Sequence, residues 1–330
     1  MILPSPTVNV ASLAVIVSRG QSRNPEKRAI EAALVEAAGS LASVRVFDVP
    51  HLYDLKLDSE VLEELRGLEC DLVVASWIFP RAAHWLLDRI GVRGQSEPTS
   101  FDELPDDEDA ADAVADAETR VIEMYPRPER KVYCLDMRAG TAEQLTEELR
   151  RIAESSEAAT VGEAATALPD RLEPVRFEDA STRRWYPVID FSRCTNCMEC
   201  IDFCLFGVYG LDDAETILVE QPDNCRKGCP ACSRVCPAGA IMFPQHKAPA
   251  IAGAPVEGDE GFKIDLSLLF GAPDQNTDAI AVAARERDEQ LLLAGREAVG
   301  MPTLRSRSTS AAGAKDDLDR LIDDLDRCDL

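Results

Sequence analysis

The sequence predicts an α/β fold for residues 1–155, followed by a small α+β domain at 185–248 and a C-terminal extension at 249–330. Two observations support this division. In the first half, short apolar runs alternate with segments of helical periodicity, which is typical of a mostly parallel sheet covered by helices. Further along, eight of the chain's 11 cysteines fall into two short runs. Residues 156–184 show no clear period, and we expect a linker there.

The predicted strands of the first half are four short apolar runs, at residues 11–17, 44–49, 71–76 and 132–137. Helical periodicity follows each of them, near residues 25–39, 59–67, 81–90 and 141–153. Asn24 is the predicted N-cap of the first helix, Pro25 its first residue and Gly39 its end. Thr141 and Gln144 predict a capping box for the last helix. The order of these elements predicts a Rossmann-like domain.

An acidic insertion interrupts this domain at residues 93–129, and we expect it to loop out because it is long for a compact domain. Between Glu97 and Glu118 it holds ten Asp or Glu and no Lys or Arg. The whole chain carries a net charge of −25. That charge argues against binding to nucleic acid or to an anionic membrane surface, and it favours a partner protein with a basic docking face.

The location of the protein is predicted from segments that the sequence lacks. No apolar run approaches the roughly 20 residues that a membrane-spanning helix requires. The N-terminal segment MILPSPTVNVASLAVIV has no basic residues before its apolar patch, so we expect the approach to a strand and no signal peptide. We therefore expect a cytoplasmic protein, in which cysteine clusters bind metal more often than they form disulfides.

The C-terminal extension is expected to be partly disordered and partly helical. One helix is predicted near residues 277–298. The last stretch, KDDLDRLIDDLDRCDL, predicts a short amphipathic helix that docks on this chain or on a partner. Its apolar face is formed by Leu318, Leu321, Ile322 and Leu325.

The two cysteine runs have the spacing of iron–sulfur ligands. The first is Cys194-x2-Cys197-x2-Cys200-x3-Cys204, and the second is Cys225-x3-Cys229-x2-Cys232-x3-Cys236. Three closely spaced thiolates wrap one face of a cubic cluster, and we expect the fourth to enter a helix that points away, toward a neighbouring cluster. The predicted ligands of the first [4Fe-4S] cluster are Cys194, Cys197, Cys200 and Cys236. Those of the second are Cys225, Cys229, Cys232 and Cys204.

Residues 187–244 resemble a bacterial-type ferredoxin domain that carries two [4Fe-4S] clusters. The resemblance includes PVID before Cys194, the ending CPAGAIMF as a closing strand, and VYGLDDAETILVEQ as a hairpin around Asp212–Asp213. It implies a ferredoxin-like fold and an electron-transfer role. Backbone N–H groups of the cysteine loops, including those of Gly228 and Gly239, are expected to donate to sulfur.

Two departures from the family pattern concern the second cluster. Leu205 stands where the family has proline after Cys204, whereas Pro237 is kept after Cys236. The loop between Cys225 and Cys229 has one extra residue, and Gly228 is expected to accommodate it through a positive φ angle. Two structural zinc sites, or one cluster beside a degraded site, are the alternatives.

The loop after the first predicted strand is a candidate anion site. It runs SRGQSRNPE and opens a helix, at the edge of the sheet where α/β domains bind ligands. The candidate residues are Ser18, Arg19, Gly20, Gln21, Ser22 and Arg23. The loop is faintly similar to that of CbiX-like tetrapyrrole chelatases, but Arg19 stands where that family has its metal-handling histidine.

Three functions follow from these features. The first is an electron carrier with two [4Fe-4S] clusters that serves a redox partner protein. The second is the redox subunit of an oxidoreductase, with a small anionic substrate bound by the N-terminal domain. The third is a chelatase-like enzyme with structural clusters, in which His84 is the residue to test. The remaining cysteines are predicted to be packed (Cys70, Cys134) or free (Cys328).

Overall fold

The computed structural model describes residues 12–102, 120–124, 127–160, 173–178, 182–255 and 279–300. Most of the acidic insertion, the amphipathic helix predicted at the C-terminus and the disorder predicted around it lie outside the described residues. Among the described residues, no helix has both the length and the apolar character needed to cross a membrane.

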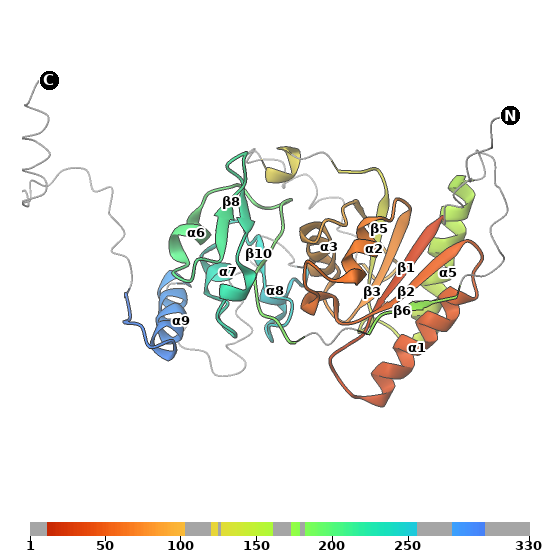
Figure 1. Ribbon diagram of the computed structural model, residues 1–330, viewed down its shortest axis with the longest axis horizontal. Helices are drawn as coiled ribbons and strands as arrows, with labels where there is room; N and C mark the ends of the chain where they lie inside the picture. The colour runs from red at the N-terminus through yellow and green to blue at the C-terminus, as the bar shows by residue number, and fades with distance from the viewer. Residues whose placement is uncertain are drawn as a thin grey trace, which may run out of the picture.

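Residues 12–178 contain an α/β region built on six strands, in the order β4-β5-β3-β1-β2-β6 (Figure 1). All neighbouring strands are parallel. The strands are β1 (Leu13–Ser18), β2 (Val44–Val49), β3 (Asp71–Ser76), β4 (Gln95–Glu97), β5 (Lys131–Asp136) and β6 (Val175–Arg176). Every residue of β1 is buried, because it pairs on both edges and is covered on both faces. This explains its unbroken apolar run.

Helices cover both faces of the sheet. α1 (Pro25–Gly39) and α5 (Ala142–Thr160) lie on one face, where they pack against Leu13, Val15 and Val17. α2 (Glu60–Arg66) and α3 (Pro80–Arg89) lie on the other face, in the same core as Ala14 and Ile16. Successive residues of β1 thus alternate between two cores, as the side-chain period of a strand requires. The predicted α/β architecture is confirmed.

The predicted helix starts are confirmed by their hydrogen bonds. Asn24 accepts from the N–H of Glu26 at 2.9 Å, with Pro25 as the first helical residue. The N–H of Thr141 donates to Gln144 Oε1 at 2.9 Å, and the N–H of Gln144 donates back to Thr141 Oγ1 at 3.3 Å. Each bond satisfies an N–H group that has no partner within the helix.

Two segments predicted to be irregular contribute to the sheet. The expected linker 156–184 supplies the end of α5 and the edge strand β6, in which Val175 pairs with Phe47 of β2. The insertion 93–129 supplies β4 on the opposite edge and a 3-10 turn, η2 (Val121–Met124). These strands are two and three residues long, so they are too short to show a periodic pattern in the sequence.

The cysteine region, residues 185–255, consists of short elements around the two cysteine runs. Its strands are β7 (Val188–Ile189) antiparallel to β10 (Ile241–Met242), and the hairpin of β8 (Tyr209–Leu211) and β9 (Ile217–Val219). Its helices are α6 (Glu199–Phe203), η3 (Pro222–Asn224), α7 (Ala231–Val235) and α8 (Pro249–Ala252). The predicted hairpin and closing strand are thereby confirmed. α9 (Ala279–Leu293), predicted near 277–298, lies beside α7 (Figure 1).

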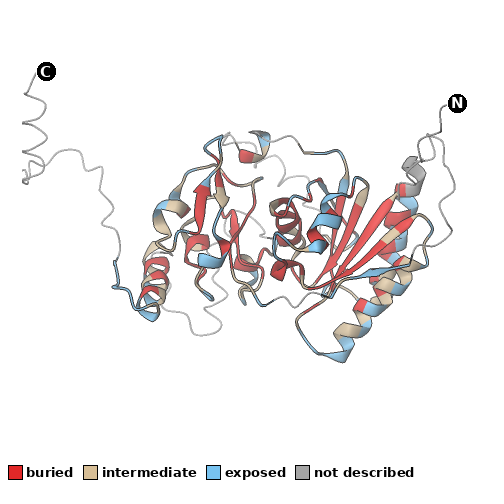
Figure 2. Cartoon of the chain, in the orientation of Figure 1, coloured by how far each residue is buried: buried red, intermediate tan, exposed pale blue. Residues whose placement is uncertain are grey.

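The two regions share one buried core. Tyr186, Val188 and Met242 belong to the same hydrophobic cluster as α2 and α3 of the α/β region, and buried residues are present in both regions (Figure 2). The hydroxyl of Tyr53 donates to the carbonyl of Tyr186 and accepts from its N–H at 2.6 Å. The two tyrosine rings stack with centroids 4.3 Å apart.

Candidate functional site

The first cysteine run forms a loop that leads into α6. Asn196 and Met198 have positive φ angles of 59° and 63°, which turn the backbone sharply on either side of Cys197. The Asn196 side chain fixes this loop to the hairpin, donating to the carbonyl of Glu215 at 3.0 Å and accepting from the N–H of Ile217 at 3.0 Å. Asparagine tolerates this backbone conformation better than most residues do.

The second cysteine run begins after η3 and leads into α7. Gly228 has a φ of +90°, and a Cβ added there would meet no atom within 4 Å. The predicted positive φ is confirmed, and glycine adopts it at little cost. The N–H of Cys229 donates to the carbonyl of Arg226 at 3.0 Å and closes the wider loop.

The eight cysteines line two separate cavities, four in each. The first cavity is lined by Cys194, Cys197, Cys200 and Cys236. The second cavity is lined by Cys204, Cys225, Cys229 and Cys232. We call these groups the first and the second cysteine set. In each set, three cysteines come from one run and the fourth comes from the other run.

Short helices produce this exchange between the runs. Cys200 and Cys232, the third cysteines, lie within α6 and α7. Cys204 and Cys236, the fourth cysteines, are the extended residues that end these helices. The expectation that the fourth cysteine enters a helix is wrong, because the helix lies between the third and fourth cysteines. The helix is nevertheless long enough to place the fourth thiol in the other cavity.

Each set contains buried thiols in an apolar environment, whereas Cys197 of the first set is exposed. Burial, together with the nearby Cys236, Cys194 and Cys197, raises the pKa of Cys200 to about 12. Burial also raises the pKa of Cys229 to about 11, with Cys204 adding to the effect. Without a bound cation these thiols stay protonated at neutral pH. A metal centre would supply the positive charge that deprotonates them.

Some sulfur atoms accept hydrogen bonds. The buried hydroxyl of Tyr209 lies 3.1 Å from Cys232 Sγ, and the N–H of Ala240 donates to Cys236 Sγ at 3.3 Å. The N–H of Gly239 donates to the carbonyl of Cys236 at 3.1 Å, so a bond from Gly239 to sulfur stays a prediction. The contact from Tyr209 joins residues 23 positions apart and depends on the hairpin, which is why the sequence alone did not reveal it.

A cation lies beside the second cysteine set. Arg287 of α9 lines the same cavity, is 4% exposed, and places its guanidinium 4.7 Å from the centre of the Phe203 ring. Asp288 accepts hydrogen bonds from the Arg287 guanidinium at 3.0 and 3.1 Å. No sequence signal indicated this residue, because α9 is separated from the cysteine runs along the chain.

The cysteines are not arranged around a single point. Within the described ranges, no group of three or more Cys, His, Asp or Glu side chains is close enough to hold one metal ion. A tetrahedral zinc site brings its four ligands into contact with one ion. A cubic cluster is wider than one ion, and its four sulfur ligands stand correspondingly further apart.

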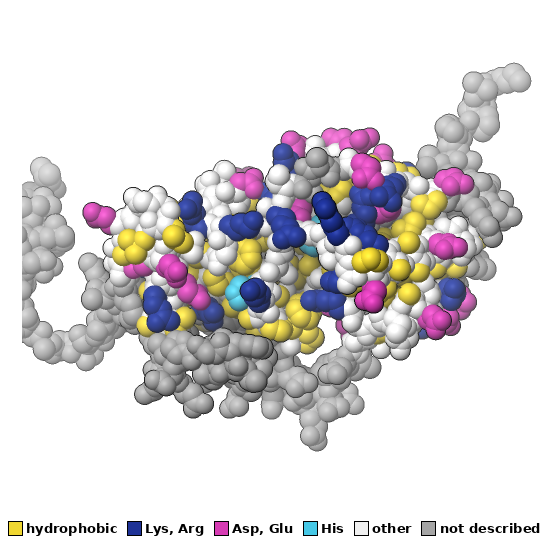
Figure 3. Space-filling model, turned by 90° about the horizontal axis from the view of Figure 1, so that it is seen from below, with side chains coloured by type: hydrophobic (Ala, Val, Ile, Leu, Met, Phe, Trp, Pro, Cys, Tyr) yellow, Lys and Arg dark blue, Asp and Glu magenta, His cyan; other side chains and the backbone are white. Residues whose placement is uncertain are grey.

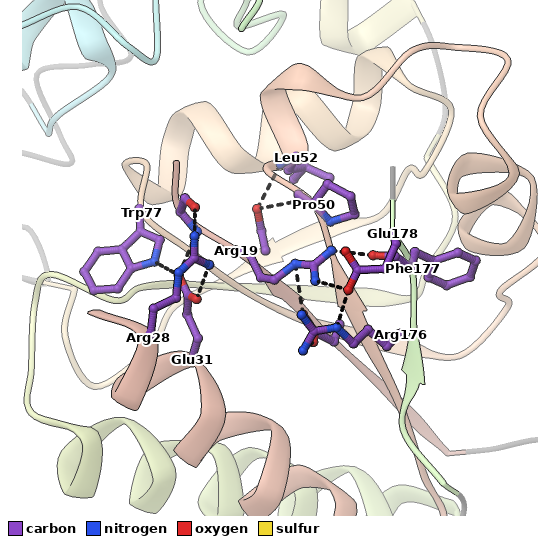
Figure 4. Close-up of polar contacts among 12 residues, drawn as sticks. Arg19, Arg28, Glu31, Pro50, Leu52, Trp77, Arg176, Phe177 and Glu178 are labelled. Carbon is purple, nitrogen blue, oxygen red and sulfur yellow. Dashed lines mark hydrogen bonds and ion pairs between the residues drawn. The ribbon is translucent and has the colours of Figure 1, made fainter. Parts of the chain in front are cut away.

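The polar groups at the start of the predicted anion loop, residues 18–20, are engaged by the chain itself (Figure 4). Ser18 accepts from the N–H of Leu52 at 2.9 Å. The Arg19 guanidinium bonds to Glu178 at 3.0 Å and to the carbonyl of Phe177. The N–H of Gly20 donates to Glu31 at 2.7 Å.

The cavity next to this loop, of about 960 Å³, is rich in carboxylates. Arg19, Gly20 and Gln21 line it, whereas Ser22 and Arg23 are exposed and are not among the residues that line it. Glu31 is 5% exposed and accepts from Gly20, Arg28 and Trp77 (Figure 4). Its carboxylate therefore holds the place at the helix start where the sequence predicted an external anion.

Comparison with known proteins gives one partial similarity. A curated protein named uncharacterized ferredoxin, from Methanocaldococcus jannaschii, is 39% identical over 85 residues, which are 24% of this chain and 57% of that protein. This chain therefore spans little more than half the length of that relative. No protein-family model and no solved structure matches the chain. The similarity supports a ferredoxin-type region in this chain.

The cysteines and histidines outside the ferredoxin-type motif are scattered. Cys134 is buried in β5, where burial raises its pKa to about 12, and burial also raises the pKa of the half-buried Cys70. Both thiols pack in the core of the α/β region, as predicted. His84 is buried in α3 and packs edge-on against Trp85, and burial lowers its pKa. Cys328 lies outside the described residues.

Proposed function

We propose that this chain is an iron–sulfur electron carrier of ferredoxin type, with a [4Fe-4S] cluster in each cysteine set. Cys194, Cys197, Cys200 and Cys236 would hold the first cluster. Cys204, Cys225, Cys229 and Cys232 would hold the second. Such clusters transfer single electrons, and the protein shields them and sets their potentials.

The composition of the two cavities carries this proposal. Each contains four thiols and apolar neighbours, including Ile189 and Ile241 in the first cavity and Val208 and Phe206 in the second. The exchange of one cysteine between the runs is the arrangement expected of two-cluster ferredoxins. Hydrogen bonds to sulfur and a nearby arginine are features that tune cluster potentials.

Zinc fits this arrangement less well. Among the described residues, no group of three or more Cys, His, Asp or Glu side chains is placed to hold one metal ion, and zinc favours pairs of separated C-x2-C motifs over runs of this spacing. The partial similarity to a protein named as a ferredoxin favours the same choice.

A redox partner protein is part of the proposal. The net charge of −25 favours a basic docking face on that partner. Figure 3 shows Lys and Arg side chains gathered across the middle of one face of the molecule. A basic partner would therefore dock on a different face.

The test is to count iron and acid-labile sulfide in full-length protein purified without oxygen. About eight of each per chain are expected, with a visible absorption that dithionite bleaches. Two double variants then separate the ligand sets. Cys194→Ala/Cys236→Ala removes two ligands from one cluster and should leave about four irons, whereas Cys194→Ala/Cys204→Ala damages both clusters and should leave almost none.

Cys70→Ala is the matched control, since Cys70 lies outside both cavities, and it should keep about eight irons. A reversed result, with more iron retained by Cys194→Ala/Cys204→Ala, would show that each run holds its own cluster. A colourless protein that contains zinc and no sulfide would refute the proposed function itself.

A further inference from the structure

Another cavity, which no cysteine lines, lies where the α/β region meets the cysteine region. It has a volume of about 280 Å³. One side is formed by Asp88, Arg89 and Arg93, at the end of α3 and just beyond it. Apolar side chains of the cysteine region also line it, including Leu218 and Val219 of β9. A pocket with an apolar wall and a few polar groups is typical of small-molecule sites.

The charge of this cavity is positive and incompletely compensated. Three arginines line it, Arg89, Arg93 and Arg127, against the carboxylates of Asp88 and Asp212. Arg127 donates to Asp88 at 2.7 and 3.1 Å, and Arg93 lies 4.0 Å from the same oxygen. Asp212 accepts from the backbone N–H groups of its own turn.

Of the three arginines that line the cavity, Arg89 is the one for which the described residues provide no ion pair. Its guanidinium lies 4.6 Å from the centre of the Tyr186 ring, and within the described part of the chain its buried Nε and Nη1 have no hydrogen-bond partner. Arg184, which lies over the same ring, is paired with Asp223 at 2.8 Å. Buried N–H groups without hydrogen bonds are costly, so such groups normally have a partner.

We propose that this cavity binds a small organic anion, with an apolar body against β9 and a carboxylate or phosphate group near Arg89. The planar guanidinium suits either oxyanion. Burial lowers the pKa of Arg89, as expected for a cation that lacks compensation. The larger cavity beside Arg19 is a weaker candidate, because the four arginines that line it are outnumbered by five carboxylates.

The position of the cavity suggests a role for the anion in electron transfer. Ile189 and Ile217 line both this cavity and the cavity of the first cysteine set. A bound anion would thus be separated from the first cluster by single side chains, as a redox substrate or an effector of that cluster requires. This second part rests on the proposed function, whereas binding of the anion does not.

The experiment measures binding of benzoate and phenyl phosphate to anaerobically purified full-length protein by calorimetry. At least one of them should bind, and the neutral benzamide should bind at least tenfold more weakly. Arg89→Gln should weaken binding at least tenfold. Leu218→Trp should also abolish binding, because it fills the cavity from the other side without changing its charge. Arg150→Gln, an exposed arginine on α5, is the matched control and should leave the affinity unchanged.

Each outcome decides one part of the inference. Failure of both probes to bind the wild type, or equal binding by Arg89→Gln, overturns the site. If benzoate binds but leaves the electron paramagnetic resonance spectrum of the reduced first cluster unchanged, the link to electron transfer is overturned and the site stands. Absence of iron and sulfide would refute the proposed clusters, while calorimetry would still test the anion site.

Discussion

At the scale of single residues, Tyr209 has the most direct influence on the second cysteine set. Its hydroxyl is fully enclosed and lies 3.1 Å from Cys232 Sγ. Donation to sulfur stabilises the reduced form of a cluster more than the oxidised form, because the reduced cluster is more negative. The net free-energy contribution of such a bond is about 1 kcal/mol, which corresponds to roughly 40 mV in the reduction potential of a one-electron couple.

If the proposed clusters are present, Tyr209→Phe should lower the potential of the second by roughly 40 mV and leave the first unchanged. The measurement is a redox titration followed by electron paramagnetic resonance. Tyr133→Phe, which removes a hydroxyl from a mostly buried tyrosine of β5, is the control and should shift neither potential. Equal shifts in both variants would show that Tyr209 does not act through its hydrogen bond.

Residues whose roles depend on local spacing were predictable from the sequence. The cap at Asn24, the positive φ of Gly228 and the grouping of cysteines into runs all follow from neighbours along the chain. Tyr209 and Arg287 were not predictable, because their contacts with the cysteine sets form only after distant segments have folded together.

At the scale of elements, α9 brings a positive charge to the second cysteine set. Arg287 is 4% exposed and lines the cavity, whereas Arg285 of the same helix is exposed to solvent. Removal of a buried positive charge disfavours addition of an electron nearby. The effect is reduced by Asp288, which already pairs with Arg287.

Arg287→Met should lower the potential of the second cluster on the order of 50 mV. Arg285→Met removes the same charge from the exposed side of α9 and should change the potential much less, because water screens it. The same titration measures both variants. If the two variants behave alike, α9 covers the second set without influencing its electrostatics.

The short helix α8 connects the cysteine region to α3 through a glycine. Gly253 has a φ of +100°, and a Cβ there would lie 2.9 Å from both Ala82 Cβ and Met242 Sδ. Gly295 also has a positive φ, of +71°, but a Cβ there would meet nothing within 4 Å. The two positions therefore share backbone strain and differ in packing.

Gly253→Ala should lower the free energy of unfolding by about 1–3 kcal/mol more than Gly295→Ala does, since only the first adds overpacking to strain. Urea midpoints of the anaerobic proteins provide the comparison. Equal midpoints would mean that α8 moves away from α3 at little cost.

Long elements were predicted well from the sequence, and very short elements were not. The apolar runs of β1, β2, β3 and β5 could be recognised, because central parallel strands are covered on both faces. β6 has two exposed residues, and its pairing with β2 is set by tertiary structure. No sequence pattern distinguishes such a segment from a linker.

At the scale of the whole molecule, the shared core joins two regions that the sequence predicted as separate domains. Tyr186 lies at the start of the cysteine region, yet its backbone N–H and carbonyl both bond to the hydroxyl of Tyr53. Arg81 of α3 adds a hydrogen bond of 2.6 Å to Asp190. Domain packing of this kind depends on surface fit, which local patterns do not encode.

We expect the two regions to unfold together in urea. Far-ultraviolet circular dichroism, which reports mainly on the α/β helices, and fluorescence of Trp185 in a Trp77→Phe/Trp85→Phe background should give coincident transitions. Two separate transitions would contradict a common core.

Tyr53→Phe should lower the urea midpoint of both transitions. It leaves the buried N–H and carbonyl of Tyr186 without their partner, at a cost of about 1–3 kcal/mol. Tyr186→Phe is the matched comparison, since it removes only the bond from its hydroxyl to the carbonyl of Tyr53 at 2.8 Å. A larger effect of Tyr186→Phe would mean that the two hydroxyls stabilise the fold through the stacking of the rings and not through the bonds to the backbone of Tyr186.

The exchange of one cysteine between the two runs has a consequence for biogenesis. Under the proposed ligand sets, a nascent chain that has emerged from the ribosome only as far as Cys204 offers the first iron–sulfur cube three thiols. The fourth arrives only with Cys236, 32 residues later in synthesis. Delivery of iron and sulfide to the first centre would therefore have to follow translation of the entire cysteine region, and a product truncated before Cys232 could mature neither centre.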